Sequence, residues 1–288
     1  MHLSELFQKK RCLFSYEIFP QSDIDKVYST IRSLQLLYPD FISITCGAGG
    51  NSVKDNLTAK IACHIKKEYD IESLVHMTCI NSSYSNLEEI LNFLKENQVT
   101  NILALRGDLP QSNTTTDFAH ARDLISLIKQ KEDFHITAAC YPEGHQESPS
   151  KLEDIRYLKE KVEAGASHLI SQLFFDNNIF YAFMDEICNA DITVPVSAGI
   201  MPIVSKRLIE KIVTLCGAFL PPKFLETLNR FENSPVSLFN AGIDYATEQI
   251  IELISRGTRG IHLYTMNNPI VAEKITKNIK ACLEKNNG

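Results

Sequence analysis

Short apolar runs alternate with amphipathic stretches along the whole chain. The runs, such as Leu13–Ile18 and Phe41–Thr45, are bounded by turn residues and fit buried parallel strands, because a helix needs about ten residues or more. Between the runs, apolar residues recur at helical spacing, as at Ile24, Val27 and Ile31. The pattern therefore predicts strands that alternate with helices.

A strand followed by a helix recurs about every thirty residues, which is the length of one βα unit. Eight strands joined in this way by short right-handed crossovers most simply close into a (β/α)₈ barrel, a TIM barrel, as a single catalytic domain over residues 1–288. An open doubly wound sheet is the alternative. The predicted strands are Leu13–Ile18, Phe41–Thr45, Leu74–Thr78, Ile102–Leu105, His135–Cys140, His168–Gln172, Val194–Ser197 and Gly260–Tyr264.

Capping and breaking residues predict where the helices begin. Ser22 is expected to cap the first helix, and another helix is expected from about Ser52. A long amphipathic helix with Val236 near its start precedes the last strand, and Pro269 should open the closing helix.

Polar side chains stand where the predicted strands end. In a (β/α)₈ barrel the active site is built at these carboxyl ends. Any one of the residues is explained as a turn residue or as a hydrogen-bonded core histidine, but agreement across most of the strands predicts a functional site. The residues are Glu17, Thr45, His76, Thr78, Asp108, Tyr141, Gln172 and Tyr264.

Among these residues, Glu17 is the strongest candidate for a catalytic role. It lies between apolar neighbours that include Phe14, Tyr16 and Phe19. Such surroundings disfavour the ionised carboxylate, which suits a general acid.

The fourth strand ends in the charged segment Arg106-Gly107-Asp108, and Pro110 then breaks the run. Opposite charges at a buried strand end are unfavourable unless they pair or hold a ligand. A pair of Arg106 with Asp108 that only closes the turn is one interpretation. Gly107 favours a functional one, since a residue without Cβ lets a ligand approach the backbone.

Charge, hydropathy and cysteine spacing argue against several classes of protein. The net charge of −6 argues against a nucleic-acid partner, for which a basic stripe is expected. No apolar segment is long enough to cross a bilayer and the first residues lack the features of a signal peptide, so we expect a cytoplasmic protein. The 8 cysteines are widely spaced, which predicts reduced thiols and no zinc site at Cys63 and His64.

The turn Cys46–Gly50 follows a strand and places glycines at positions 47 and 49, as a dinucleotide fingerprint would. Ser52 occupies the third glycine position, and no acidic residue ends the next strand where a ribose anchor is expected. A Rossmann site is therefore disfavoured. Neither a Walker phosphate loop nor a nucleophile elbow is present in the sequence.

The combined motifs resemble those of bacterial methylenetetrahydrofolate reductases, which are flavoproteins built on a (β/α)₈ barrel. The resemblance spans nearly the whole chain, and Arg-Gly-Asp-Leu-Pro followed by Gln-x-Phe-Phe-Asp is a specific combination. The matching segments are Phe14–Pro20, Ile44–Ala48, His76–Cys79, Leu103–Pro110, Tyr141–His145, Lys161–Ala166, Gln172–Asp176, Gly199–Pro202 and Ile261–Asn267.

The resemblance implies a ping-pong reduction of methylenetetrahydrofolate to methyltetrahydrofolate on one FAD. NADH or NADPH would be the donor, and the product would feed one-carbon metabolism and methionine synthesis. Glu17 matches the general acid that opens the five-membered ring of the folate, and Asp108 matches a carboxylate that stabilises the resulting cation. The predicted substrate and nicotinamide contacts are Thr45, Gln172, Tyr264 and Asn268.

The resemblance also implies how FAD is bound. Arg106 and Lys161 suit a pyrophosphate or its neighbouring hydroxyls, and Asp154 suits a ribose. No metal is expected, and family members are commonly homo-oligomers. The predicted cofactor contacts are Thr45, Ala48, His76, Arg106, Gly107, Asp108, Ala121, Tyr141, His145, Asp154 and Lys161.

Two positions depart from the family pattern. Asn268 stands where enteric members carry an arginine near the folate or nicotinamide, and Ile212 replaces an aromatic residue that stacks on bound nicotinamide. The regulatory domain of eukaryotic relatives, and with it inhibition by S-adenosylmethionine, is not expected. Two alternatives stay open: a pterin-binding barrel that transfers a methyl group without flavin, and a folate- or flavin-binding protein without turnover.

Overall fold

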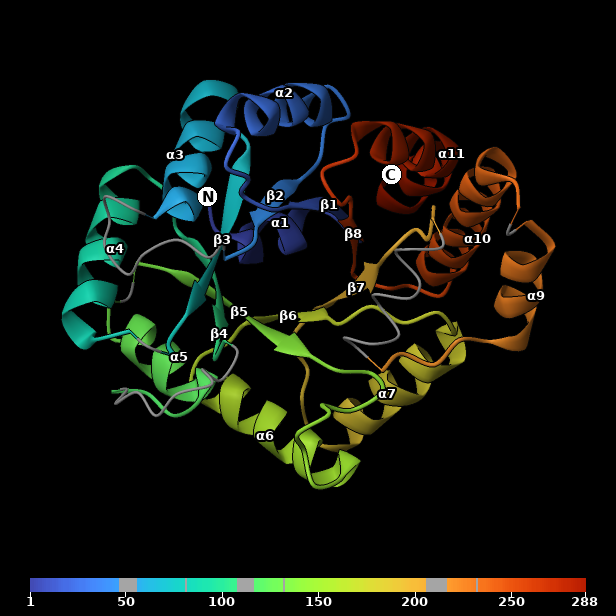
Figure 1. Ribbon diagram of the computed structural model, residues 1–288. Helices are drawn as coiled ribbons and strands as arrows, with labels where there is room; N and C mark the ends of the chain where they lie inside the picture. The colour runs from blue at the N-terminus through green and yellow to red at the C-terminus, as the bar shows by residue number, and fades with distance from the viewer. Residues whose placement is uncertain (47–55, 81, 108–116, 132, 206–216, 232) are drawn as a thin grey trace.

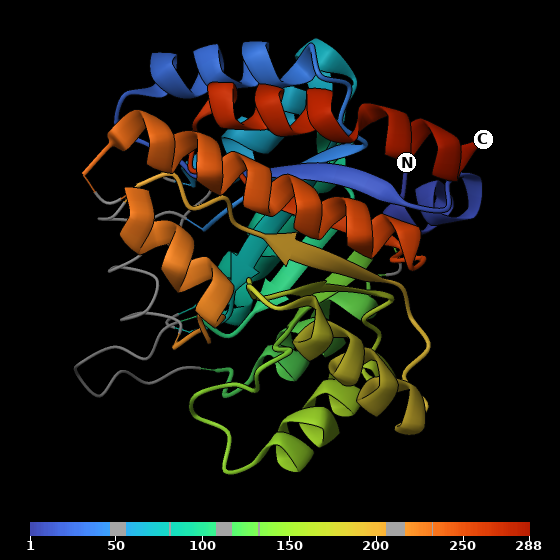
Figure 2. The same ribbon diagram turned by 90° about the vertical axis from the view of Figure 1, so that its right-hand side faces the viewer.

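Eight parallel strands close into a barrel in the order β1 to β8, with helices around it (Figures 1 and 2). The computed structural model describes residues 1–46, 56–80, 82–107, 117–131, 133–205, 217–231 and 233–288. The predicted (β/α)₈ barrel is confirmed. The strands are β1 (Leu13–Ile18), β2 (Phe41–Ile44), β3 (Glu72–Thr78), β4 (Asn101–Leu105), β5 (His135–Cys140), β6 (His168–Ser171), β7 (Val196–Ile200) and β8 (Gly260–Tyr264).

Most helices form an outer layer that buries an apolar face against the strands (Figure 1). In α2, for example, Val27, Ile31 and Leu34 are buried at helical spacing. The helices are α1 (Leu3–Lys9), α2 (Ile24–Gln35), α3 (Leu57–Tyr69), α4 (Tyr84–Glu96), α5 (Ala121–Lys129), α6 (Lys151–Glu163), α7 (Asn177–Asn189), α9 (Pro222–Phe231), α10 (Pro235–Ser255) and α11 (Pro269–Asn287).

Three strands, β1, β5 and β8, have the predicted bounds, but the predicted seventh strand is misplaced. The expected range Val194–Ser197 is wrong, because β7 runs from Val196 to Ile200. Pro195 has no amide hydrogen for the ladder, so the strand begins after it, although its carbonyl still accepts a hydrogen bond from Leu169 N at 3.0 Å.

The first helix cap also differs from the prediction. Asp23, not Ser22, caps α2, and its side chain accepts a hydrogen bond from Lys26 N at 3.3 Å. Both residue types are good caps, and sequence alone does not choose between neighbours. The described part of the next helix, α3, begins at Leu57 with Asn56 as its cap, and residues 47–55 lie outside the described residues.

Helix α1 was not predicted, and it closes the end of the barrel where the strands begin (Figure 2). Its apolar residues Leu3 and Phe7 are buried in one cluster with Phe41 and other strand residues. Asn101, at the start of β4, accepts a hydrogen bond from Leu3 N at 2.9 Å. Because α1 covers this end, we expect a ligand to approach the barrel from the opposite end.

The inside of the barrel is unusually polar. Branched apolar residues dominate the interior of most such barrels, whereas here buried serines, threonines and histidines pair across neighbouring strands. The pairs are Ser43 Oγ to His76 Nε2 at 2.6 Å, Ser15 Oγ to His262 Nδ1 at 2.7 Å, Thr137 Oγ1 to His168 Nδ1 at 3.0 Å and Ser197 Oγ to His168 Nε2 at 2.9 Å. These hydrogen bonds satisfy groups that would otherwise be unfavourable to bury.

The described cysteines are free thiols: Cys12, Cys46, Cys63, Cys79, Cys140, Cys188 and Cys282. Across the described ranges we find no helix with the length and hydropathy that a membrane span needs.

Candidate functional site

Glu17 lies near the carboxyl end of β1, at the open end of the barrel. The strand register places it opposite Ser43 of β2 and Tyr264 of β8. Its Oε2 atom is 3.6 Å from His76 Nε2 and 3.5 Å from His262 Nε2. The side chain keeps 19% of its surface exposed, so a ligand at the barrel mouth can reach the carboxylate.

The contact between Glu17 and His76 is not an ion pair at neutral pH. Burial lowers the pKa of His76 to about 4, although the nearby Glu17 carboxylate acts in the opposite direction. His76 is therefore neutral at pH 7, and its Nε2 also lies 2.6 Å from Ser43 Oγ. A neutral imidazole therefore faces the Glu17 carboxyl group at the barrel mouth.

Tyr264 is positioned beside Glu17 by a close approach of three strands. Its hydroxyl donates a hydrogen bond to Ser171 O at 2.8 Å. A Cβ at Gly199 would lie 2.7 Å from that hydroxyl and 2.2 Å from Ser171 O, so only glycine fits there. Gly199, the first residue of the matching segment Gly199–Pro202, thus leaves the space that the Tyr264 side chain occupies.

Other predicted substrate contacts lie around the same mouth. Gln172 follows β6 and accepts a hydrogen bond from Leu173 N at 2.9 Å through its Oε1. Thr45 follows β2, and its N donates to Ile18 O at 3.0 Å. Asn268 caps α11 by accepting from Ile270 N at 3.1 Å, so its side-chain oxygen already serves the helix. The substrate roles of these residues stay predictions.

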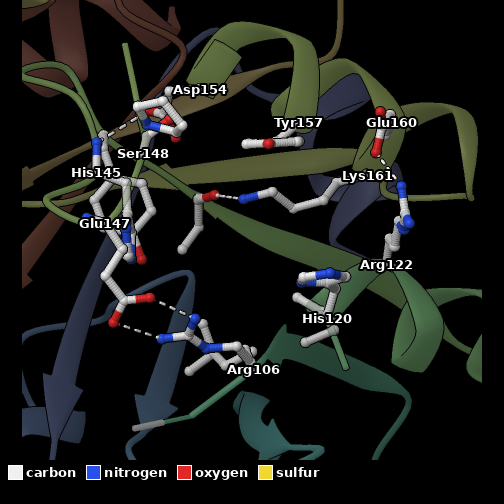
Figure 3. Close-up of a pocket in the computed structure, with 16 residues that line it drawn as sticks. Arg106, His120, Arg122, His145, Glu147, Ser148, Asp154, Tyr157, Glu160 and Lys161 are labelled. Atoms are coloured by element: carbon white, nitrogen blue, oxygen red, sulfur yellow. Dashed lines mark hydrogen bonds and ion pairs between the residues drawn. The ribbon is translucent and has the colours of Figure 1, made fainter. Parts of the chain in front are cut away.

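A cavity of about 390 Å³ opens between α5, α6 and the carboxyl ends of β4 and β5 (Figure 3). Its size is within the range of small-molecule sites. Cationic, anionic and aromatic side chains all line it. The lining residues are Ala104, Leu105, Arg106, His120, Ala121, Arg122, Ala139, Tyr141, His145, Glu147, Ser148, Pro149, Asp154, Tyr157, Glu160 and Lys161.

Lys161 extends from α6 into the middle of this cavity (Figure 3). Its Nζ donates a hydrogen bond to Ala139 O at 2.8 Å, and burial lowers its pKa. Burial raises the pKa of Asp154, which accepts a hydrogen bond from His145 N at 3.2 Å. A half-buried ammonium near a carboxyl group suits a ligand that carries both negative charge and hydroxyl groups.

Two ion pairs lie on opposite sides of the cavity (Figure 3). Arg106 binds Glu147 in a bidentate pair, with Nη1 to Oε2 at 2.6 Å and Nη2 to Oε1 at 3.0 Å. Arg122 of α5 pairs with Glu160 of α6. The Arg106 side chain thus binds a carboxylate from the loop after β5, and Asp108, the partner weighed from the sequence, lies outside the described residues.

A second cavity of about 250 Å³ adjoins the first on the side of the barrel mouth. Gln172, Leu173, Glu143 and Ala218 are among its lining residues. The two cavities share Arg106, Tyr141, His145 and Glu147. A ligand with two parts could therefore lie across both.

The structure brings together six of the predicted cofactor residues, since Arg106, Ala121, Tyr141, His145, Asp154 and Lys161 all line the larger cavity. His76 lies apart from that wall, inside the barrel beside Glu17. Ala48, Asp108 and Ile212 fall outside the described residues, so their predicted roles stay predictions.

Gly107 has a structural explanation that differs from the one inferred from the sequence. Its φ is +89°, and an added Cβ would lie 2.7 Å from Ile80 Cγ2 and 3.1 Å from Thr78 Cβ. Side chains, rather than open space for a ligand, occupy the position beside it. The turn itself requires glycine.

Sequence reasoning missed several residues of the cavity, notably Arg122, Glu147, Tyr157 and Glu160. Helical spacing could have found two of them. Tyr157 and Glu160 follow Asp154 at intervals of three residues on α6, so they share its face. Glu147 and Arg122 come from other elements, and only the closed barrel brings them to the cavity.

Acidic, histidine and cysteine side chains do not gather into a metal-binding group anywhere in the described part of the chain. The candidate site has two parts: the Glu17 group at the barrel mouth, and the charged cavity at the carboxyl ends of β4 and β5.

The chain is similar in sequence to several known proteins. The family model described as methylenetetrahydrofolate reductase matches residues 2–280. A 5,10-methylenetetrahydrofolate reductase from Pectobacterium carotovorum is 35% identical over 256 residues, which cover 88% of this chain and 85% of that protein. Methylenetetrahydrofolate reductase (NADH) 1 from Arabidopsis thaliana is 31% identical over 284 residues, and the chain spans about half of its length, 48%.

A solved structure supports the fold alone. An uncharacterised protein from Clostridium thermocellum, described as binding two copies of 5-methyl-5,6,7,8-tetrahydrofolic acid, superposes with a TM-score of 0.65 at 15% sequence identity. The match covers 98% of this chain and 99% of that one.

Proposed function

Because the chain belongs to the methylenetetrahydrofolate reductase family, a family of oxidoreductases, we propose that it reduces methylenetetrahydrofolate to methyltetrahydrofolate with NADH or NADPH and a bound FAD. One observation carries the proposal. A partly exposed carboxyl group, Glu17, stands at the barrel mouth beside a neutral histidine, and a charged cavity around the half-buried Lys161 opens at the carboxyl ends of β4 and β5. The first suits an acid, and the second suits a dinucleotide.

The residues of the cavity fit FAD. Lys161 is a half-buried cation, and burial lowers its pKa, so a bound anion would stabilise its charged form. Arg106 offers a planar fork of donors for phosphate, and Asp154 offers acceptors for ribose hydroxyls. Tyr141 is an aromatic surface between the two cavities, and burial raises its pKa to about 12, so it stays neutral.

FAD, when bound, would supply the centre that accepts a hydride from the nicotinamide and donates one to the folate. The protein's task is then to orient the two substrates in turn at the barrel mouth, which is a ping-pong sequence. We assign this orientation to Thr45, Gln172, Tyr264 and Asn268, which stand around the mouth. The Clostridium thermocellum protein of the same fold is described as binding 5-methyl-5,6,7,8-tetrahydrofolic acid, so a barrel of this fold can hold such a ligand.

Glu17 would deliver the proton that the folate step requires. Opening the five-membered ring of methylenetetrahydrofolate breaks a carbon–nitrogen bond, and the leaving nitrogen must be protonated. Glu17 is close to the mouth, partly exposed and flanked by His76 and His262. Asp108 would stabilise the cation formed on the folate, as the family resemblance implies.

Two further proposals rest on the family alone. We propose a homo-oligomer, and we propose that the protein acts in one-carbon metabolism in the cytoplasm and supplies methyltetrahydrofolate for methionine synthesis. Sedimentation of the purified protein at two concentrations would test the first.

An anaerobic experiment tests the proposed function. The purified protein should be yellow, should bleach on addition of NADH or NADPH, and should regain its absorption when methylenetetrahydrofolate is added. A colourless protein that still binds folate would favour a methyl-transferring barrel. A yellow protein that cannot be reoxidised by the folate would favour a binding protein without turnover.

A further inference from the structure

Glu147 occupies the position where an anionic ligand would meet Arg106. The two side chains form a fork-to-fork pair at 2.6 and 3.0 Å. A guanidinium binds carboxylate and phosphate oxygens in the same bidentate geometry. The carboxylate therefore stands in for a phosphate group.

The pair lies at the junction of the two cavities. Arg106 and Glu147 line both of them, together with Tyr141 and His145. A dinucleotide that places one half in each cavity must pass its pyrophosphate through this junction. Arg106 would then meet the pyrophosphate, and Glu147 would face the same negative charge.

Glu147 is free to leave without disturbing the fold. Its side chain is 53% exposed, whereas that of Arg106 is 25% exposed. Its backbone is anchored separately, because Glu147 N donates a hydrogen bond to His145 Nδ1 at 3.1 Å. An exposed ion pair contributes little stability. The free energy lost when the carboxylate rotates into solvent is therefore small compared with that gained from a bound anion.

We propose that Glu147 is an internal competitor of the cofactor's pyrophosphate. It occupies the guanidinium of Arg106 in the absence of cofactor and moves into solvent when the phosphates bind. The inference rests on the proposed function, because it takes FAD as the ligand. Its consequence is that the wild-type chain binds phosphate-bearing ligands less tightly than the cavity allows.

The cavity offers a matched control. Glu160 pairs with Arg122 on the opposite side, away from the junction (Figure 3). It also pairs with Arg156 at 2.9 Å. Glu160→Gln removes the same charge from the same cavity as Glu147→Gln, but at a place where no pyrophosphate is expected.

The test compares ligand binding to protein stripped of flavin. Calorimetric titrations with FAD, ADP, inorganic pyrophosphate and riboflavin would be run on the wild type, Glu147→Gln and Glu160→Gln. We expect Glu147→Gln to bind FAD, ADP and pyrophosphate about three- to tenfold more tightly at low salt, with the gain shrinking at high salt. Riboflavin, which has no phosphate, should bind the wild type and Glu147→Gln alike.

The outcomes separate this inference from the proposed function. Wild-type protein that binds no flavin contradicts the proposed function, while the pyrophosphate titration still tests the competitor. Equal or weaker phosphate binding by Glu147→Gln contradicts the competitor, because Glu147 would then orient Arg106 or do nothing. An equal gain in Glu160→Gln would also contradict it, since the effect would be general charge and not competition at Arg106.

Discussion

Two carboxylates on the barrel strands, Glu17 near the open end and Glu72 at the closed end, have opposite surroundings. Glu72 begins β3, with Oε1 at 2.8 Å from Lys66 Nζ and Oε2 at 3.5 Å from Asn101 Nδ2. Glu17 meets histidine nitrogens at 3.5 and 3.6 Å, and among the described residues no lysine or arginine pairs with it. Glu72 is thus tied to a cation inside the fold, whereas Glu17 lies beside a neutral imidazole where a ligand can reach it.

The histidines of the two ends differ in the same way. At the closed end, His168 is hydrogen-bonded to Thr137 and Ser197 and packs on Phe7 with ring centroids 4.8 Å apart. At the open end, Nε2 of His76 and Nε2 of His262 lie 3.6 and 3.5 Å from Glu17 Oε2, and the former is also hydrogen-bonded to Ser43. Residue type alone therefore does not define a site: the open end adds a carboxyl group that a ligand can reach.

The largest expected effect is on turnover at the open end. Glu17→Gln keeps the side-chain volume but cannot donate the proton, so steady-state reduction of methylenetetrahydrofolate should fall by about 10² to 10⁴. Its unfolding free energy, measured with urea, should stay within about 1 kcal/mol of the wild type. Wild-type turnover in this variant would show that the reaction does not need the Glu17 carboxyl group, and the proposed difference between Glu17 and Glu72 would be wrong.

Acid should destabilise the fold through its buried histidines. Burial lowers the pKa of His135 to about 3 and that of His76 to about 4, and it lowers the pKa of His168 well below its usual value. In the unfolded chain these groups take up protons near pH 6.5, so stability is complete above that pH and is lost as the pH falls toward the folded values.

Each such histidine should remove about 2 kcal/mol between pH 6.5 and pH 5. Carboxylates titrate mainly below this window, so urea unfolding at pH 7, 6 and 5 isolates the histidines. Stability that is constant or higher at pH 5 would show that the imidazoles are not held neutral inside the barrel.

Glu72→Gln should have the opposite effect to Glu17→Gln: it should lower stability and leave turnover unchanged. The amide keeps the shape but leaves the half-buried Lys66 without full compensation, which should cost about 1 to 3 kcal/mol of unfolding free energy. Turnover at a temperature well below the melting point should be unchanged. Normal stability together with lost turnover in this variant would contradict the assignment of Glu72 to the fold and not to the reaction.

The smallest effect is expected for His135→Phe. His135 Nε2 is buried and makes no hydrogen bond within the described residues, while Nδ1 lies 3.1 Å from Ser167 Oγ. The substitution removes a hydrogen bond, which destabilises the fold, and a buried unpaired nitrogen, which stabilises it. The two effects should nearly cancel, so the unfolding free energy at pH 7 should change by less than about 1 kcal/mol. The loss between pH 7 and pH 5 should shrink by about 2 kcal/mol, and an unchanged loss would assign the acid sensitivity elsewhere.

The order of strands and the polar open end could be predicted because each depends on local pattern. Short apolar runs and helical spacing identify the elements, and Glu17 is recognisable at a strand end next to its apolar neighbours. Glu147 and Arg122 could not be found, because their partners lie 41 and 38 residues away along the chain. Helix α1 was missed because its burial depends on the closed barrel, which exists only after the strands assemble.

The most direct test separates the two half-reactions by stopped-flow absorbance in Glu17→Gln, with His168→Asn as the closed-end control. Only the folate step needs a proton from the protein. We expect Glu17→Gln to be reduced by nicotinamide within about tenfold of the wild-type rate, yet to pass electrons to methylenetetrahydrofolate slower by about 10² or more, while folded His168→Asn performs both steps normally. Equal slowing of both steps in Glu17→Gln, or a normal folate step, would contradict the assignment of Glu17 as the acid.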